Sequence, residues 1–253
     1  MAVQPSTDRF SDRANDYDAY RPGYPAAIIP WLQQVLLPAK LSVVADIGAG
    51  TGIFSGLFLQ EGYRVKAVEP NAAMRAKAQP LCTQYRHLEI IDGTAEHSGL
   101  QPQSIDLITV AQAFHWFNLP AAKKEWRRIL QPGGHVLLAW NMLQKDTPFL
   151  KAYAALKERY GEKNAHPDHA NAAVIDAFFS PLPVITHRVR HIQWRNTDGI
   201  KGLLSSSSKV PLPGQSRYGE MMHALDVLFE RYAENHLLKL EYETVLYLSQ
   251  LNQ

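Results

Sequence analysis

Three glycines stand at every second position near the end of the apolar stretch 43–52, at Gly48, Gly50 and Gly52, and Asp46 shortly precedes them. Glycine lets the backbone approach a ligand closely and adopt conformations that other residues resist. Such a turn suits a nucleotide-like ligand, and an acid beside it suits a ligand that carries a cationic ammonium. The alternative interpretation is a turn with a structural role only.

A second acid, Glu69, ends the next apolar segment, at 63–69, and Pro70 follows it. Open α/β sheets bind ligands at the carboxyl ends of their strands, and an acid there commonly accepts hydrogen bonds from ribose hydroxyls. The sequence therefore predicts a ribose next to Glu69. The alternative is a solvated glutamate at the end of a strand.

The glycine spacing favours some ligands over others. A dinucleotide-binding turn prefers Gly-x-Gly-x-x-Gly and holds pyrophosphate at a helix N-terminus. Ile53 occupies the place of the third glycine in that pattern, and Asp46 is poorly placed beside a pyrophosphate. The spacing is therefore less typical of NAD binding than of another nucleoside-containing ligand.

His115 is the residue best suited by type and place to move a proton, because it follows the apolar segment 104–111. The carboxyl-end rule puts reacting groups there. It acts either as a base or only as a wall of the pocket. The other notable histidines, His166 and His169, have no cysteine or further ligand cluster beside them, so we predict no metal site.

The elements that must position these residues alternate between strands and helices. Strands are expected at 43–47, 63–69, 87–91, 104–111 and 135–140, and helices at 53–61, 70–79 and 118–130. This alternation is typical of βαβ units and a parallel sheet. Later segments predict helices at 148–160 and 170–179, strands at 184–195 and 241–248, and between them an amphipathic helix carrying Met221, Leu225 and Tyr232.

The N-terminal region is expected to be a leader that ends in a break. The segment 10–20 is compatible with a helix that places Phe10 and Tyr17 along one side. Arg21-Pro22-Gly23 interrupts it, because proline restricts both itself and its predecessor, and a helix is expected at 26–37. The leader either packs on the domain surface or closes over the site as a lid.

These motifs together resemble those of a known family. The pattern Asp46-x-Gly48-x-Gly50-x-Gly52 resembles motif I of the class I S-adenosylmethionine (SAM) methyltransferases, and over about residues 41–141 the remaining motifs follow in that family's order. Those motifs are Glu69, the turn Thr94-Ala95-Glu96, the fourth strand and the turn at 130–134. The leader and the segment 113–117 are similar to a narrower group, the small-molecule enzymes related to trans-aconitate methyltransferase.

The resemblance implies an α/β fold of the Rossmann-like class I methyltransferase type. Its sheet would have seven strands, mostly parallel, with helices on both faces and an antiparallel last strand. It implies a single domain with three parts: a lid segment at 1–25, a SAM-binding core at 26–141, and a part at 142–253 that completes the sheet and caps the substrate pocket.

The resemblance also implies roles for individual residues. By this resemblance, Asp46 would orient the ammonium of SAM through water, Glu69 would hold the ribose, and Ala95 would meet the adenine. The full set of implied cofactor contacts is Asp46, Gly48, Ala49, Gly50, Gly52, Glu69, Pro70, Thr94, Ala95, Glu96, Ala111, Tyr20 and Arg21. The implied substrate pocket consists of Tyr17, Phe114, Trp116, Phe117, Trp140 and Asn141, with His115 as the candidate catalytic residue.

The implied activity is SAM-dependent transfer of a methyl group to a small-molecule acceptor, at an oxygen of a carboxylate, with S-adenosylhomocysteine as product and no metal. One alternative is a methyltransferase-like protein that binds a ligand or partner without turnover. Another is a methyltransferase acting on a nucleic acid or protein. An enzyme that methylates nucleic-acid amines would carry Asn/Asp-Pro-Pro-aromatic after the fourth strand, and residues 111–114 do not match.

Composition sets outer limits on function. Of the 253 residues, 46% are hydrophobic, and the net charge of +2 predicts no bulk attraction to nucleic acid or membrane. The basic residues between His187 and Arg195 alternate along a predicted strand, so they do not form one patch. One cysteine, Cys82, suits a reducing compartment, and no run approaches the ~20 apolar residues of a membrane helix, so we expect a cytoplasmic protein. We expect it to be a monomer or a homodimer.

Overall fold

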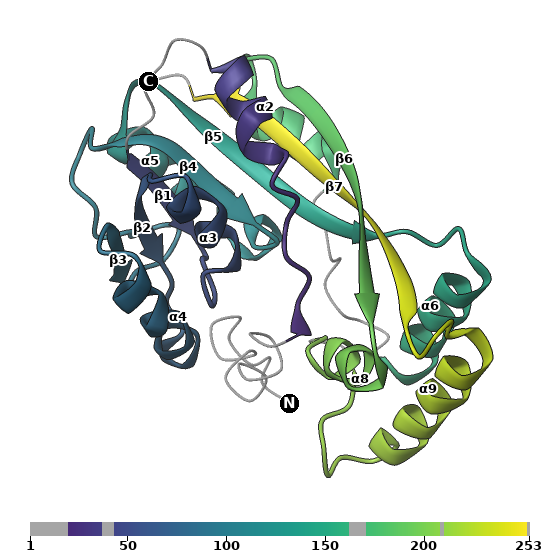
Figure 1. The fold of residues 1–253 in the computed structure, drawn as a ribbon. Helices are drawn as coiled ribbons and strands as arrows, with labels where there is room; N and C mark the ends of the chain where they lie inside the picture. The colour runs from purple at the N-terminus through teal and green to yellow at the C-terminus, as the bar shows by residue number, and fades with distance from the viewer. Residues whose placement is uncertain (1–19, 37–42, 162–170, 208–209, 252–253) are drawn as a thin grey trace.

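The computed structural model describes residues 20–36, 43–161, 171–207 and 210–251 (Figure 1). The predictions for Phe10 and Tyr17, and for His166 and His169, lie outside the described residues. No helix in the described ranges is long and apolar enough to cross a membrane.

The centre of the molecule is a seven-stranded sheet in the order β3-β2-β1-β4-β5-β7-β6. Its strands are β1 (Val43–Ile47), β2 (Arg64–Val68), β3 (Leu88–Ile91), β4 (Ile105–Ala111), β5 (Leu130–Leu143), β6 (Ile185–Arg195) and β7 (Leu238–Gln250). The first five strands pair in parallel, and β7 lies antiparallel between β5 and β6. This arrangement confirms the predicted sheet with its antiparallel last strand.

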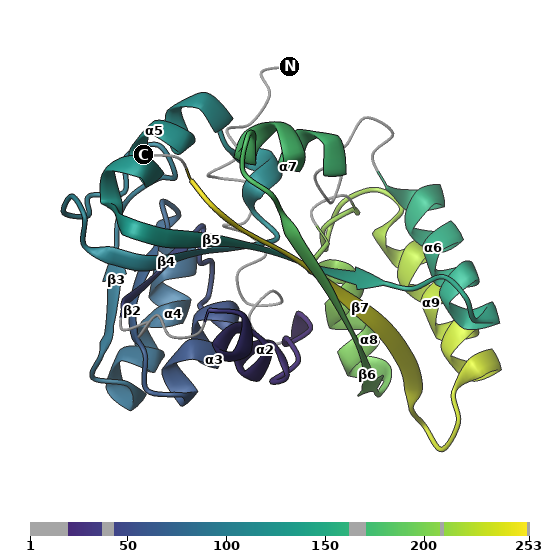
Figure 2. The same cartoon turned by 90° about the horizontal axis from the view of Figure 1, so that it is seen from above.

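Helices cover both faces of the sheet (Figure 2). Their bounds are α2 (Ile28–Val35), α3 (Ile53–Gln60), α4 (Ala72–Gln84), α5 (Leu119–Ile129), α6 (Pro148–Tyr160), α7 (Ala172–Phe179), α8 (Thr197–Ser205) and α9 (Tyr218–Tyr232). Helices α5 and α7 pack on one face, around Trp126 and Phe179, whereas α2 and α3 pack on the other, around Ile28 and Phe58.

Side-chain caps fix where several helices begin. Asn71, Asn118 and Asn196 accept hydrogen bonds from the backbone N–H groups of Met74, Ala121 and Gly199 at the starts of α4, α5 and α8. Such caps satisfy N–H groups that have no partner within the helix. The first of these caps lies beside Glu69, so it also sets the position of the chain that follows β2.

The last two strands extend beyond the five-stranded core. Along this extension, α6, α8 and α9 build a third cluster of buried side chains that includes Tyr153, Leu225 and Tyr242. Figures 1 and 2 show α6 and α9 side by side at the end of β7, away from α3 and α4. The molecule therefore consists of a sheet core and a helical end that share β7.

A short segment at residues 20–25, which we call the strap, joins these two parts. It precedes α2 and crosses the sheet between the core and α8 (Figure 1). The carbonyl oxygen of Gly23 accepts hydrogen bonds from Asn141 Nδ2 at 2.9 Å and from Gln193 Nε2 at 3.1 Å. The strap is thus attached to both β5 and β6.

Candidate functional site

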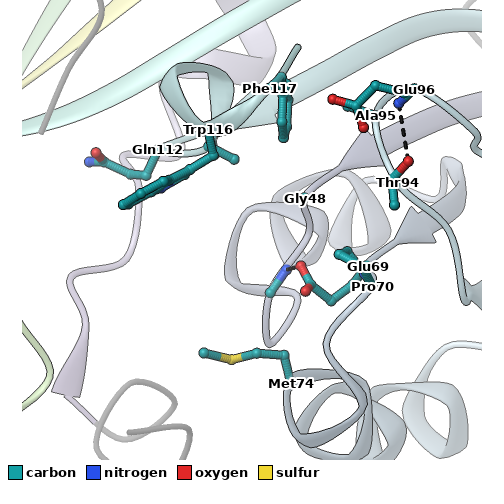
Figure 3. A pocket seen from close by; sticks show the side chains of 13 residues that line it. Gly48, Glu69, Pro70, Met74, Thr94, Ala95, Glu96, Gln112, Trp116 and Phe117 are labelled. Atoms are coloured by element: carbon teal, nitrogen blue, oxygen red, sulfur yellow. Dashed lines mark hydrogen bonds between the residues drawn. The ribbon is translucent and has the colours of Figure 1, made fainter. Parts of the chain in front are cut away.

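A cavity opens at the carboxyl ends of β1, β2 and β4 (Figure 3). This is the edge at which open α/β sheets bind ligands. The residues that line it are Gly48, Gly50, Glu69, Pro70, Met74, Thr94, Ala95, Glu96, Ala111, Gln112, Ala113, Trp116 and Phe117.

The glycine turn after β1 forms the floor of this cavity. Gly48, Gly50 and Gly52 have φ angles of +71°, +59° and +83°, in the left-handed region that favours glycine. A Cβ atom on Gly48 would lie 2.8 Å from the Cβ of Ala113 and 3.2 Å from the ring of Phe117. Glycine is therefore required at position 48 both by the backbone conformation and by the space beside it.

Glu69 lines the cavity with its carboxylate held in place. Its Oε2 accepts a hydrogen bond from Gly50 N and its Oε1 accepts one from Asn71 N, both at 2.9 Å. Burial raises the pKa of Glu69, although these two hydrogen bonds and the charge of Arg75 act in the opposite direction. A carboxylate offers about four lone-pair sites, so the two oxygens can accept further hydrogen bonds from a ligand.

Asp46 lies behind the turn and does not line the cavity. It is 1% exposed, and its two oxygens accept hydrogen bonds from Ser55 Oγ at 2.6 Å and Thr109 Oγ1 at 2.9 Å. Burial raises its pKa to about 6, against the lowering effect of these two hydrogen bonds. Asp46 was expected to orient the ammonium of SAM. In the structure its carboxylate connects β1 to α3 through Ser55 and to β4 through Thr109.

The turn at Thr94, Ala95 and Glu96 borders the cavity opposite Met74 (Figure 3). Thr94 Oγ1 accepts a hydrogen bond from Glu96 N at 3.3 Å, and Trp126 Nε1 donates to Ala95 O at 3.1 Å. Within the described ranges no acceptor is bonded to the backbone N–H of Ala95. The turn is thus held by its neighbours, and one of its N–H groups remains for a ligand.

The chain that follows β4 forms the remaining wall. Gln112 adopts φ +59°, its Nε2 donates to Asn141 O at 3.1 Å, and Trp116 closes a short 3₁₀ turn, η2 (Phe114–Trp116). Gln112, Ala113 and Met74 line the cavity but were not among the predicted site residues. An apolar side chain in a helix, such as Met74, gives no sequence signal that separates a cavity wall from the core.

Several predicted substrate-pocket residues lie elsewhere. Phe114 is 0% exposed, and its ring packs edge-on against Phe178 with centroids 5.0 Å apart. Trp140 is 2% exposed and packs against Tyr247, on the face of β5 opposite Asn141. The prediction was therefore wrong for Phe114 and Trp140, because the 3₁₀ turn and the pleat of β5 direct both rings into the core.

Other predicted residues support the cavity from outside its lining. Ala49 and Gly52 belong to the glycine turn, and His115 lies in η2, but none of the three is a lining residue. The side chain of Asn141 is bonded to β7 and to the strap: its Oδ1 accepts from Thr244 Oγ1 at 2.6 Å and its Nδ2 donates to Gly23 O.

The strap places Tyr20 and Arg21 beside α8 rather than at the cavity lining. Arg21 donates from its guanidinium to Ser206 O at 2.9 Å, and the ring of Tyr20 lies directly over Gly202. The described residues contain no group of three or more His, Cys, Asp and Glu side chains that could hold a metal ion. The cavity thus offers oxygen acceptors, backbone N–H groups and aromatic walls.

Residues 45–138 match the family model of a methyltransferase domain. An uncharacterized methyltransferase of Mycobacterium bovis is 32% identical over 187 residues, which cover 74% of this chain and 70% of that protein. A methyltransferase-like protein of Schizosaccharomyces pombe is 31% identical over 165 residues, which cover 63% of this chain and 62% of that protein.

A solved structure shows the same fold over most of the chain. It is a protein from Anaeromyxobacter dehalogenans, named as a candidate type II methyltransferase, with a TM-score of 0.70 and 24% identity. The alignment covers 93% of this chain and 100% of that one. The likeness therefore includes the helical end as well as the matched core.

Proposed function

The chain belongs to the class I SAM-dependent methyltransferases, and on that premise we propose that it transfers the methyl group of SAM to a small-molecule acceptor, at a carboxylate oxygen. The observation that carries the proposal is that the glycine turn and the fixed carboxylate of Glu69 line one cavity. Both features match the chemistry of a nucleoside-containing ligand, and they meet at the sheet edge where ligands bind.

The residues present fit this cofactor. Gly48 lines the cavity with its backbone and holds a φ of +71°, so this part of the turn can lie close to the methionine end of the cofactor. Glu69 has lone pairs left for the ribose hydroxyls, and the Ala95 N–H is available to an acceptor nitrogen of adenine. Met74 and Pro70 supply apolar surface to the cavity lining.

SAM supplies a methyl group that its sulfonium has already activated. The protein therefore has to bind the acceptor, align it and exclude water, and positioning of this kind lowers the barrier substantially. Trp116, Phe117 and Gln112 form the wall above the glycine turn in Figure 3, and we assign the acceptor to that side. Their aromatic surface excludes water, while the Gln112 side chain is fixed by Asn141.

The choice of a carboxylate acceptor rests on whether the cavity offers a base that could remove a proton from the acceptor. A hydroxyl or amine acceptor must lose a proton, and a positioned base typically contributes ~10²–10⁴-fold to such a step. A carboxylate is ionised at neutral pH and needs no base. Among the residues that line the cavity there is no histidine. Of the two lining carboxylates, Glu69 is assigned to the ribose, and Glu96 accepts a hydrogen bond from Asn118 N at 2.8 Å.

Two other functions carry less support. A binding protein without turnover would be expected to have lost part of the glycine turn or Glu69, and both are intact. Activity on nucleic acid would require a basic surface beside the cavity, whereas Arg188 and Arg190 extend from β6 into solvent and pair with Glu243. We therefore retain a small-molecule acceptor.

The test is transfer from SAM labelled in its methyl group, using a mixture of small organic acids and a matched mixture of the corresponding amines and alcohols. We expect label in the acids only, released again by mild alkali as methyl esters are. Label confined to the amines or alcohols would contradict a carboxylate acceptor. Binding of SAM without transfer to either mixture would favour the protein without turnover.

His115 provides a second test of the same assignment. Because a carboxylate needs no base, we expect His115→Gln to reduce turnover by less than ~100-fold, below the usual effect of losing a base. Steady-state rates across neutral pH would measure this. A larger loss that also removed the wild-type pH dependence would make His115 the base and would favour a hydroxyl or amine acceptor.

A further inference from the structure

Strand β6 is the outermost strand of the sheet, and among the described strands it pairs with β7 alone (Figure 1). The pairing runs from Ile185 to Arg195, which corresponds to roughly 36 Å of strand. In an antiparallel ladder, alternate residues direct their backbone N–H and C=O groups away from the neighbouring strand. Within the described ranges these outward groups bond to no other backbone group. The outer edge of β6 is therefore a template for a further strand.

The sequence of this edge lacks the features that normally prevent such pairing. Natural edge strands are protected by proline, by lysine, by a bulge or by being very short. Residues 185–195 contain no proline, lysine or glycine, and their register with β7 shows no bulge. Two arginines point outward, but Glu243 of β7 forms ion pairs with Arg188 at 2.7 Å and with Arg190 at 3.5 Å. The chain thus supplies its own counter-charge at this edge.

The two faces of β6 differ in what covers them. The odd-numbered side chains face α2 and the strap: His187 stacks on Trp31 with ring centroids 4.6 Å apart, and Gln193 is bonded to the strap. The even-numbered side chains from position 186 to 194 are exposed, and they include Ile192 at 51% and Trp194 at 50%. Large apolar side chains that are exposed next to one another are typical of an interaction surface.

A second copy of the same strand fits this edge in one register. In a contact with two-fold symmetry, each residue faces the residue that lies equally far on the other side of the axis. An axis at Arg190 would place the two Arg190 side chains opposite each other, and an axis one residue earlier would place Arg188 opposite Arg190. Like charges directly opposite are destabilising. An axis at His191 pairs residues 187–195 of both copies, which is the longest overlap that leaves no arginine opposite another.

With the axis at His191, the exposed face of β6 is complementary to itself. Arg188 would face Trp194 of the partner subunit, and Arg190 would face Ile192 of the partner subunit. A guanidinium over a tryptophan ring gains a cation–π attraction, and the apolar stem of an arginine can cover an isoleucine. Both exposed apolar side chains would then be covered, while Glu243 keeps the two arginines neutralised.

We propose that this chain forms a two-fold symmetric dimer in which β6 of each copy pairs antiparallel with β6 of the other, about an axis at His191. The backbone groups of the two edges satisfy one another, and the sheet continues through both copies. The contact involves no residue of the cavity, because β5 and β7 separate β6 from β1, β2 and β4. This inference does not depend on the proposed function.

Sedimentation equilibrium of the full chain tests the dimer over a protein concentration series from micromolar to millimolar. We expect the mass of one chain at the low end and of two chains at the high end. Ile192→Lys places a second cation opposite Arg190 of the partner subunit, so it should weaken the dimer by about 10-fold or more. Ile192→Glu places a carboxylate there, so it should keep the dimer.

The same two variants separate dimerisation from folding. Within one copy, Ile192 pairs with Glu241 of β7, so a lysine at position 192 suits the folded monomer better than a glutamate does. At micromolar concentration we therefore expect a higher melting temperature for Ile192→Lys than for Ile192→Glu, which is the reverse of their order in dimerisation. The matched control is Val227→Lys on α9, where the side chain is also 50% exposed, and it should leave the dimer unchanged.

Three results would overturn the proposal. The first is a wild-type chain that stays monomeric throughout the series, and if that monomer sedimented with phosphatidylserine vesicles, the exposed face would be assigned to a lipid surface instead. The second is a dimer that Ile192→Lys leaves intact, which would place the contact elsewhere. The third is equal weakening by Ile192→Lys and Ile192→Glu, which would contradict the pairing with Arg190. All variants should bind S-adenosylhomocysteine like the wild type, and a wild type that does not bind it would count only against the proposed function.

Discussion

Both carboxylate oxygens of Glu69 accept backbone N–H groups, one from Gly50 in the glycine turn and one from Asn71 at the start of α4. A glutamine cannot accept both, because one of its terminal groups is a donor. We expect Glu69→Gln to weaken SAM binding by about 1.5–3 kcal/mol, the range for hydrogen bonds to a charged group. Calorimetric titration with SAM would measure it.

The same variant should also lower stability slightly, since one backbone N–H loses its acceptor at a cost of about 1–3 kcal/mol. Replacing a solvated glutamate with no partner in the protein would leave the free energy of unfolding unchanged. Unchanged SAM affinity together with reduced stability would assign Glu69 to the turn alone.

Asp46 makes stability depend on pH. Burial raises its pKa from 3.8 to about 6, so the folded state favours the protonated carboxyl. Its stabilising contribution is present below the unfolded pKa and is lost as pH rises through about 6. The side chain of the Asp46→Asn variant stays neutral at every pH. Relative to this variant, the wild type should lose up to about 3 kcal/mol of unfolding free energy as the pH rises from 3.8 to about 6.

Chemical denaturation of both proteins between about pH 4 and about pH 8 would measure the difference, and the other carboxyl groups cancel in the comparison. A constant gap between the two unfolding free energies would contradict a raised pKa. The result matters for function, because Asp46 connects β1, the strand that leads into the glycine turn, to Ser55 of α3 and Thr109 of β4.

Individual site residues were predictable from sequence where the backbone supplies the contact. The turn at Gly48 and Gly50 and the acid Glu69 could be identified because their place follows from a strand end. The direction of a side chain after a strand could not, since it depends on the pleat and on local turns. Phe114 and Trp140 therefore entered the core, although their neighbours Ala113 and Trp116 line the cavity.

The strap contacts α8 where the ring of Tyr20 lies against Gly202, and a substitution at Gly202 tests this contact. In helices, Gly→Ala usually stabilises by about 0.5–1 kcal/mol. A Cβ on Gly202, however, would lie 2.0 Å from the ring of Tyr20. We expect Gly202→Ala to destabilise the protein, because the ring and the strap must move.

A double-mutant cycle with Tyr20→Ala would show that the strap causes this effect, since Gly202→Ala should become stabilising once the ring is absent. The matched control is Gly56→Ala in α3, where nothing lies within 4 Å of the new Cβ. Equal stabilisation by both glycine substitutions in the wild-type background would mean that Tyr20 does not pack on α8.

At the scale of elements, strands with local signals were predicted better than those that depend on a distant partner. The expected strand at 135–140 is in fact β5 (Leu130–Leu143), because its far end pairs with β7 at Tyr242 and Thr244. No property of residues 141–143 alone indicates that pairing. This extension of β5 also places Asn141 beside the strap, whereas the sequence had predicted it in the substrate pocket.

At the scale of the whole molecule, the mostly parallel sheet was predicted from the alternation of strands and helices, and its seven strands and antiparallel β7 were predicted from the family resemblance. The separation of the molecule into a sheet core and a helical end could not be predicted in this way. Helices α6, α8 and α9 pack on one another and on β7, so they form the helical end at the far side of the strap. The candidate cofactor cavity belongs to the core.

The central claim is that the cavity at Gly48 and Glu69 binds SAM, and thermal unfolding with ligand tests it most directly. Ligand at about 100 times its dissociation constant should stabilise the protein by about 2.7 kcal/mol. For a chain of this size each kcal/mol raises the melting temperature by about 2–4 °C. We predict such a rise with SAM and with S-adenosylhomocysteine and none with NAD. A rise with NAD alone, and none with either sulfur compound, would contradict the account.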